Sequence, residues 1–442
     1  MTDLYRLGLV DALAAIASGS LSARDYLESC IARTLATEPV VGAFAWFDAD
    51  AARTSAAGLA PGGVLSAMPI GFKDIIATRG IPTEMGSAAF VGHVPDHSAW
   101  VVDTLAAAAA LMFGKTVTTE FAWRHPGRTR NPWNPAHTPG GSSSGSAAAV
   151  AVGSVPAALG TQTLGSVLRP AAFCGVVGYK PSFGVIPRTG VYPLAASLDH
   201  IGVFTRSVGD AALLVAVLTG RDGIDFLNTP APAPAWPLNE PTRAPRIALL
   251  RTAMWDRAGA AQRALVESVA GRLEADGATV VPLELPAEFD ALWTIAKTLC
   301  DAEGGAVAAA LAHEQPPRVS VPTIELAARG AALTAADYLH AKEAQQALIR
   351  AFAILMAPFD AALTAPALGE APPGLADTGD AVFCTPASLL GAPAIALPAG
   401  VGTHGLPLGV QLLARWGDDR RLLETAAWVE RRLGWSAPFP MT

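Results

Sequence analysis

Apolar segments that read alternately as strand and helix recur along the chain, and they constrain its fold more than any other feature. GAFAWF (residues 42–47) and AMPIGFKDI (residues 67–75) predict buried strands. AWVVDTLAAAAALMFGKTV (residues 99–117) predicts a helix, a turn and a strand. This alternation predicts an α/β fold, with a mixed or parallel sheet covered by helices on both faces.

A helix between two strands recurs in the second half of the chain. RIALL (residues 246–250) and ATVVPLEL (residues 278–285) predict the strands, and residues 261–277 predict a helix that ends at Gly277. The last elements predicted are two strands and a terminal helix, at APAIALPAG, LPLGVQLLA and RRLLETAAWVERRLG (residues 392–400, 406–414 and 420–434).

The start of the chain differs from the proline-rich middle. Residues 4–35 predict helices, because apolar side chains recur at helical spacing over residues 9–16 and Ser22 can cap a second helix over residues 23–35. Residues 226–245 are rich in proline, which neither a helix nor a central strand sustains. We expect a surface crossover there rather than a linker between domains.

Composition excludes several classes of protein. Of the 442 residues, 51% are hydrophobic and 16% are charged, so a large buried core is expected rather than disorder. The net charge is −7, with no lysine or arginine run, which argues against nucleic acid or an anionic membrane as the main partner. No metal cluster or disulfide frame is expected, because the cysteines lie far apart without CxxC spacing (Cys30, Cys174, Cys300 and Cys384).

The first residues and the longest apolar runs bear on location. MTDLYRLG has no basic region ahead of an apolar stretch, so a signal peptide is not expected. The apolar runs carry a charge or stop short of about 18 residues, so no transmembrane helix is predicted. We expect a cytoplasmic protein.

PGGSSSGSAAAVAVG (residues 139–153) admits three interpretations: a linker, a phosphate-binding loop or a catalytic loop. A linker would have polar flanks, but these serines run directly into apolar material suited to a buried helix. A phosphate loop fits the spacing of Gly140 and Gly145, yet Ser146 stands where the motif needs lysine. The catalytic loop is therefore the interpretation that we pursue.

A second turn of small residues lies in ALGTQTLGSVLRPAAFCGVVGYKPSFG (residues 158–184), where Ser166 directly follows Gly165. Small residues allow a sharp turn that points consecutive N–H groups at one spot, as an oxyanion hole requires. A nucleophilic serine also needs a base. The histidines are scattered, mostly in predicted turns, and none has a setting that suggests a catalytic triad (His93, His97, His125, His137, His200, His313, His340 and His404).

Lys73 is a different candidate base. It ends the apolar segment PIGFK, so partial burial would lower the pKa of its amine. The alternative is an ordinary lysine paired with Asp74, which from this residue alone would be favoured.

Taken together, these residues carry a resemblance. Lys73 within PIGFKDI, the loop GGSSSGSAAA and the segment GTQTLGSVLRPAAFCGVVGYKPS resemble the amidase signature family of Ser–cis-Ser–Lys hydrolases. GRTRNPWNPAHTPGGSSSGS is similar to the family's approach to its serine loop. TPASLLGAPAIALPAG and LPLGVQLL are similar to its C-terminal signature. A lone GGSS is weak evidence, but this ordered set covers most of the chain.

The resemblance implies a role for each matching residue. Ser166 is the nucleophile, Ser142 is the bridging serine after a cis peptide, and Lys73 is the terminal base. The amides of four consecutive residues form the oxyanion hole (Thr163, Leu164, Gly165 and Ser166). Four residues support the loops (Gly140, Gly141, Ser143 and Gln162). No metal or organic cofactor is implied.

Three positions depart from the family's pattern. Gln162 replaces a common aspartate, and its oxygen can still accept hydrogen bonds from loop amides. Leu164 replaces a glycine, and its N–H remains available. Arg169 lies one position later than the family's usual arginine. These departures suggest a divergent branch of small-molecule hydrolases.

The function implied is cleavage of the C–N bond of small aryl or aliphatic amides, with carbamates or urethanes as further substrates. Trp123 and Trp133 could line a pocket for an aryl or alkyl group, or be structural. Two alternatives stay open: an A-type glutamine amidotransferase subunit, which supplies ammonia within a complex, and a catalytically silent ligand-binding scaffold.

The fold implied is one α/β/α sandwich around a large mixed sheet, in a single amidase domain over residues 1–442. Its expected parts are an N-terminal helical wrap, a catalytic signature region, a proline-rich crossover and a C-terminal half that completes the sheet (residues 1–70, 67–225, 226–245 and 246–442). The helical wrap offers a surface for a homodimer. The expected partner is a small-molecule substrate, without nucleic acid or membrane.

Overall fold

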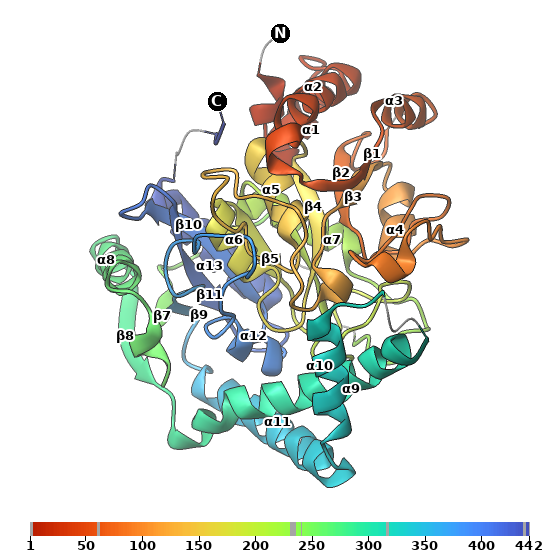
Figure 1. Ribbon diagram of the computed structural model, residues 1–442. Helices are drawn as coiled ribbons and strands as arrows, with labels where there is room; N and C mark the ends of the chain where they lie inside the picture. Colours follow the sequence, from red (N-terminus) through yellow and green to blue (C-terminus); the bar gives the residue numbers. More distant parts are fainter. Residues whose placement is uncertain are drawn as a thin grey trace.

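The structure is a computed structural model that describes residues 3–59, 62–229, 236–239, 241–314, 318–435 and 439–441. Within these residues, a mixed 11-stranded sheet has the strand order β1-β3-β2-β4-β6-β5-β10-β11-β9-β7-β8 (Figure 1). The strands are β1 Phe44–Phe47, β2 Pro69–Lys73, β3 Leu111–Thr116, β4 Ala157–Gln162, β5 Val177–Lys180, β6 His200–Thr205, β7 Arg246–Arg251, β8 Thr279–Glu284, β9 Ala361–Thr364, β10 Ala394–Val401 and β11 Pro407–Leu413.

Helices cover the sheet on both faces, which confirms the predicted α/β fold with a mixed sheet. The α-helices are α1 Leu9–Ala17, α2 Ala23–Val41, α3 Ala49–Ala57, α4 Trp100–Ala107, α5 Ser144–Val152, α6 Leu168–Cys174, α7 Val208–Leu218, α8 Ala260–Ala275, α9 Leu292–Glu314, α10 Val321–Ala331, α11 Ala335–Leu355, α12 Thr385–Leu389 and α13 Asp419–Leu433. Helices α5 and α6 pack together against the sheet, and α7 packs with α13. Helices α9, α10 and α11 form a separate helical group at the bottom of the view in Figure 1.

The predicted strand and helix segments are largely confirmed. Strands β7 and β8, which precede and follow α8 along the chain, pair in parallel. The two predicted C-terminal strands are the antiparallel pair β10 and β11. The predicted end of the second helix is wrong: α2 continues to Val41 despite Pro39 and ends at Gly42, whose φ of 59° supplies a left-handed cap. Part of the predicted crossover, residues 230–235 and 240, lies outside the described residues.

Small side chains bring α5 close to the sheet and fix the loop that precedes it. Every residue of α5 is buried. A Cβ on Gly145 would lie 2.1 Å from the carbonyl oxygen of Ala43 and 2.3 Å from the backbone nitrogen of Val117. Only glycine permits this close approach. Because α5 lies so near the sheet, the serine loop that precedes it is held beside the ends of β2 and β4.

Candidate active site

Lys73, Ser142 and Thr161 meet in the interior. Lys73 is the last residue of β2 and is fully buried, with an exposed fraction of 0%. Its Nζ lies 2.7 Å from Oγ of Ser142 and 2.8 Å from Oγ1 of Thr161. The amine is therefore held between two hydroxyl groups, with no carboxylate among these hydrogen-bond partners.

Burial sets the protonation of Lys73. It lowers the pKa of the amine well below its ordinary value, and the negative charge of Asp199 opposes that shift. The alternative that Lys73 pairs with Asp74 is wrong. Asp74 instead lies beside Lys115 of β3, 3.5 Å between Oδ1 and Nζ. A neutral Lys73 can accept a proton from Ser142.

The loop before α5 holds Ser142 in place. The peptide bond between Gly141 and Ser142 is cis. Gly140 has a φ of 82°, and a Cβ there would lie 2.8 Å from Cα of Pro170, so this position requires glycine. Nη2 of Arg169 donates to the carbonyl oxygen of Gly141 at 2.6 Å. Arg169, which lies one position later along the chain than the family's usual arginine, therefore still reaches the serine loop.

The second loop, from Thr163 to Ser166, connects β4 to α6. None of its four amide N–H groups donates a hydrogen bond to another part of the chain that the structure describes. Ser166 is 9% exposed and lines the same cavity as Ser142, Thr163, Leu164 and Gly165. Free amides beside a serine in a cavity are the arrangement that an oxyanion hole requires.

Gln162 and Ser143 brace the two loops. Oε1 of Gln162 accepts hydrogen bonds from the amides of Val167 and Leu168 at 2.9 and 3.0 Å. Oγ of Ser143 lies 3.2 Å from both the amide nitrogen and the carbonyl oxygen of Thr161. A neutral amide side chain thus performs the hydrogen bonding that was inferred for Gln162 from sequence.

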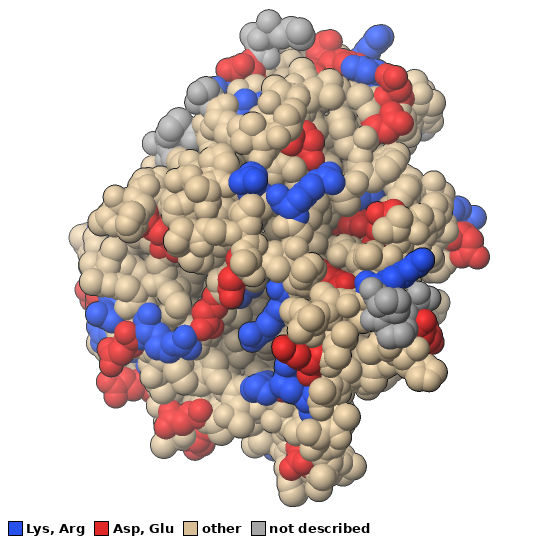
Figure 2. Space-filling model, viewed as in Figure 1, with Lys and Arg blue, Asp and Glu red and all other residues tan. Residues whose placement is uncertain are grey.

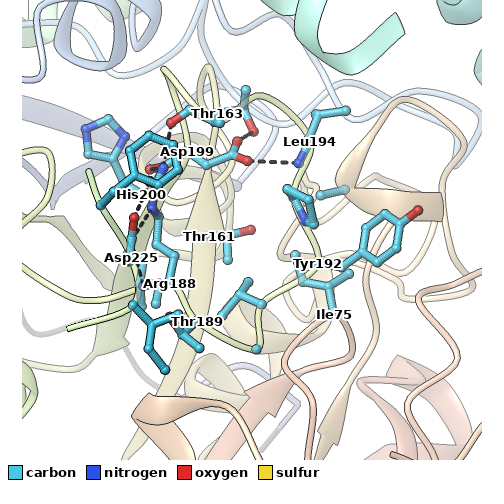
Figure 3. A pocket seen from close by; sticks show the side chains of 18 residues that line it. Ile75, Thr161, Thr163, Arg188, Thr189, Tyr192, Leu194, Asp199, His200 and Asp225 are labelled. Atoms are coloured by element: carbon cyan, nitrogen blue, oxygen red, sulfur yellow. Dashed lines mark hydrogen bonds and ion pairs between the residues drawn. The ribbon is translucent and has the colours of Figure 1, made fainter. Parts of the chain in front are cut away.

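Sequence reasoning missed Thr161 and Asp199. Asp199, at the end of the loop that leads into β6, accepts from Oγ1 of Thr163 at 2.6 Å and from the amides of Leu194 and Ala195 at 2.8 and 2.9 Å (Figure 3). It fixes one end of the oxyanion loop. Thr161 stands two residues before Thr163, and this spacing was the only signal for it in the sequence. No motif marked Asp199.

The cavity at Ser166 has a volume of about 670 Å³ and a strongly charged lining. Five cations and four acids contribute to it (Arg124, Arg169, Arg257, Lys297, Arg329, Asp301, Glu325, Asp377 and Asp380). On the surface, basic and acidic side chains gather around a hollow near the lower centre of the face in Figure 2. The cavity therefore suits a substrate with polar or charged groups beside its amide.

The two tryptophans of the sequence analysis have different roles. Trp123 lines the Ser166 cavity, and the guanidinium groups of Arg124 and Arg329 lie 5.3 and 5.7 Å from its ring centre. Trp133 instead packs in a small apolar cluster with Phe173 and donates from Nε1 to the carbonyl oxygen of Cys174. Trp133 is structural.

Among the described residues, no group of three or more His, Cys, Asp or Glu side chains is placed to hold a metal ion. No helix in the described part of the chain is both long and apolar enough to cross a membrane.

Comparisons with known proteins show which family the chain resembles. The family model described as Amidase matches residues 25–423. The A subunit of glutamyl-tRNA(Gln) amidotransferase from Anaeromyxobacter sp. (strain K) is 33% identical, over 98% of this chain and 97% of its own length.

Solved structures give the same result. The peptide amidase PAM in complex with chymostatin is 28% identical, with a TM-score of 0.85 and 99% of each chain covered. A chain from an inhibitor-bound vestigial protein complex, linked to the origins of an s-triazine catabolic enzyme, is 28% identical, with a TM-score of 0.89. It covers 97% of this chain and 99% of its own. The chain described here therefore belongs to the amidase signature family.

Proposed function

We propose that this protein cleaves the C–N bond of small amides through an acyl-enzyme on Ser166. The observation that carries the proposal is the contact between the buried Lys73 amine and Ser142, beside a serine whose neighbouring amides have no hydrogen-bond partner among the described residues. This arrangement supplies a base, a bridging hydroxyl, a nucleophile and an oxyanion hole.

The reaction has two halves. Neutral Lys73 takes the proton of Ser142 as Ser142 takes that of Ser166, and Oγ of Ser166 forms a bond to the substrate carbonyl carbon. When the C–N bond breaks, the relay returns the proton to the nitrogen, and a neutral amine or ammonia leaves. Water then adds to the ester and gives its proton to the relay. The ester breaks to release the acid and restore the Ser166 hydroxyl.

The loop amides stabilise the charge that develops on the carbonyl oxygen. They belong to residues fixed on both sides, by Asp199 at Thr163 and by Gln162 at the start of α6. Removing a single oxyanion donor in comparable sites costs about 10²–10³-fold in kcat. Leu164 keeps its N–H, and its side chain packs against the hydrophobic core.

A second candidate function is that of an A-type glutamine amidotransferase subunit, which releases ammonia within a complex. The curated relatives favour it over the stand-alone hydrolase, because the A subunits of glutamyl-tRNA(Gln) amidotransferases reach 33–35% identity over 94–98% of this chain. The mixed charges of the Ser166 cavity also suit the zwitterionic end of glutamine. Under this function a protein partner is required; under the first, we expect a cytoplasmic homodimer and a substrate that extends to carbamates.

The test is a released-amine and released-ammonia screen over glutamine, primary amides, anilides and carbamates. We expect hydrolysis by the wild-type chain, its loss in Ser166→Ala and its retention in Ser18→Ala, which changes an exposed serine far from the cavity. Turnover of glutamine alone, raised by a co-purifying protein, would favour the amidotransferase.

A fluorophosphonate probe provides a readout that needs no substrate. It should label Ser166 in the folded wild-type chain, and mass spectrometry of the digested protein locates the modified serine. No labelling, together with no product in the screen, would reject both enzymes and leave the silent scaffold.

A further inference from the structure

A second cavity, of about 340 Å³, lies beside the Ser166 cavity. We call it the Tyr192 cavity. Its apolar lining includes Ile75, Tyr192 and Ile201, and Thr161 and Thr163 also line it (Figure 3). The labelled side chains in Figure 3 surround an open centre.

The charged groups of the Tyr192 cavity are already satisfied. Arg188 and Asp225 form a two-pronged ion pair at 2.9 and 3.0 Å, and Asp199 holds its three donors from the protein. Burial lowers the pKa of His200 well below its ordinary value, so this ring is neutral. A ligand thus finds apolar surface but no unpaired charge, and a neutral group fits best.

Two large apolar side chains stand exposed at the lining. Ile224 is 71% exposed and Phe226 is 89% exposed. Their loop is fixed, because Oδ1 of Asp222 accepts from the amides of Ile224 and Asp225, and Arg188 anchors Asp225. Apolar side chains held in water at a cavity indicate a binding surface for an apolar group.

The position of the cavity relates it to the leaving group. Thr161, which accepts a hydrogen bond from Lys73, lines the Tyr192 cavity, whereas Ser142 and Ser166 line only its neighbour. Ala122, Thr163 and Leu194 line both cavities, so the two adjoin. In the proposed reaction Ser142, which lines the Ser166 cavity, returns the proton to the departing nitrogen, and a substituent on that nitrogen can extend past Thr163 into the adjoining Tyr192 cavity.

We propose that the Tyr192 cavity is the subsite for the leaving amine, and that this amine carries a neutral aryl or branched alkyl group. This inference rests on the proposed function. The acyl part of the substrate then occupies the charged Ser166 cavity. A glutaminase releases ammonia, which leaves an apolar subsite of this size unused, so the inference favours N-substituted amides.

The test compares two substrates that share one acyl group, a primary amide and the corresponding anilide. Ala196→Trp fills the cavity from an exposed position, and Ala261→Trp makes the same change on an exposed face of α8. We expect Ala196→Trp to lower kcat/KM for the anilide about 10–100-fold and to change it less than about threefold for the primary amide. Ala261→Trp should change neither.

Phe226→Ser is the second variant, because this exposed side chain can be removed without opening the core. We expect about a tenfold rise in KM for the anilide with kcat retained. Aniline should act as a competitive inhibitor of the wild type, and about tenfold more weakly in both Tyr192-cavity variants.

Three outcomes decide the matter. Equal losses on both substrates in Ala196→Trp would overturn the subsite and indicate a path for ammonia or water. Unchanged anilide kinetics and aniline inhibition in both variants would overturn it as well. Absence of turnover of either substrate by the wild type rejects the proposed hydrolase itself, and the inference falls with it.

Discussion

Two lysines on adjacent strands show how one side chain supports either structure or chemistry. Lys73 of β2 and Lys115 of β3 are both completely buried, and Phe72 is the register partner of Lys115. Lys115 faces a carboxylate, Asp74, and also donates to the carbonyl oxygen of Ile76 and to Oγ1 of Thr83, each at 2.6 Å. Among the residues that the structure describes, Lys73 donates only to the hydroxyls of Ser142 and Thr161.

The difference in surroundings gives the two amines different charges. Burial lowers the pKa of Lys115, but Asp74 opposes it and leaves the pKa at about 8, so this amine remains a cation at neutral pH. The pKa of Lys73 is lowered well below its ordinary value, with only the charge of Asp199 in opposition. A partner carboxylate makes a structural ion pair, and its absence makes a base.

The first prediction concerns Lys73→Met, which replaces the amine by an apolar side chain of similar length. We expect kcat/KM to fall by about 10²–10⁴-fold, because the proton relay loses its base. The free energy of unfolding should stay equal or rise, since a desolvated amine is removed. Steady-state kinetics and urea unfolding measure the two effects. A large loss of stability would show that Lys73 is as structural as Lys115.

The second prediction concerns Lys115→Met, which leaves the Asp74 carboxylate buried without its cation. We expect the free energy of unfolding to fall by about 3–5 kcal/mol, while the folded fraction keeps its kcat/KM within about threefold. Adding Asp74→Asn should recover most of the loss, because the amide oxygen still accepts from the amide of Glu84. Without recovery in the double variant, the ion pair is not what distinguishes the two lysines.

The sequence predicted the parts of this comparison that are local. The apolar run PIGFK placed Lys73 at the end of a buried strand, and the short distance along the chain from Gln162 to Val167 and Leu168 made their hydrogen bonds foreseeable. The strands and helices that follow simple periodicity were predicted for the same reason. The resemblance, rather than the pattern alone, united Lys73 with the two serines.

The features of the site and fold that the sequence did not predict depend on contacts between residues distant along the chain. Asp199 meets Thr163 across 36 positions, and Ser388 meets Gln162 across 226. Nothing local in Asp74 showed whether it would face Lys73 or Lys115, because that depends on how β2 and β3 align. The sheet order and the helical group α9–α11 were not predicted either, since both depend on pairings that periodicity does not encode.

The last prediction sharpens the comparison through Asp199, the charge that opposes neutralisation of Lys73. The base must be neutral, so kcat/KM falls as pH drops through the pKa of Lys73. Asp199→Asn removes the charge that raises this pKa, and the acidic limb of the pH profile should move to lower pH. Because the amide can still bond to Thr163 and Leu194, the stability loss should be only about 0.5–1.5 kcal/mol. Thr163→Val is the matched control: it breaks the hydrogen bond but keeps the charge, so its acidic limb should stay where it is. If the limb moves in the control and not in Asp199→Asn, Asp199 acts on the site through position and not through charge.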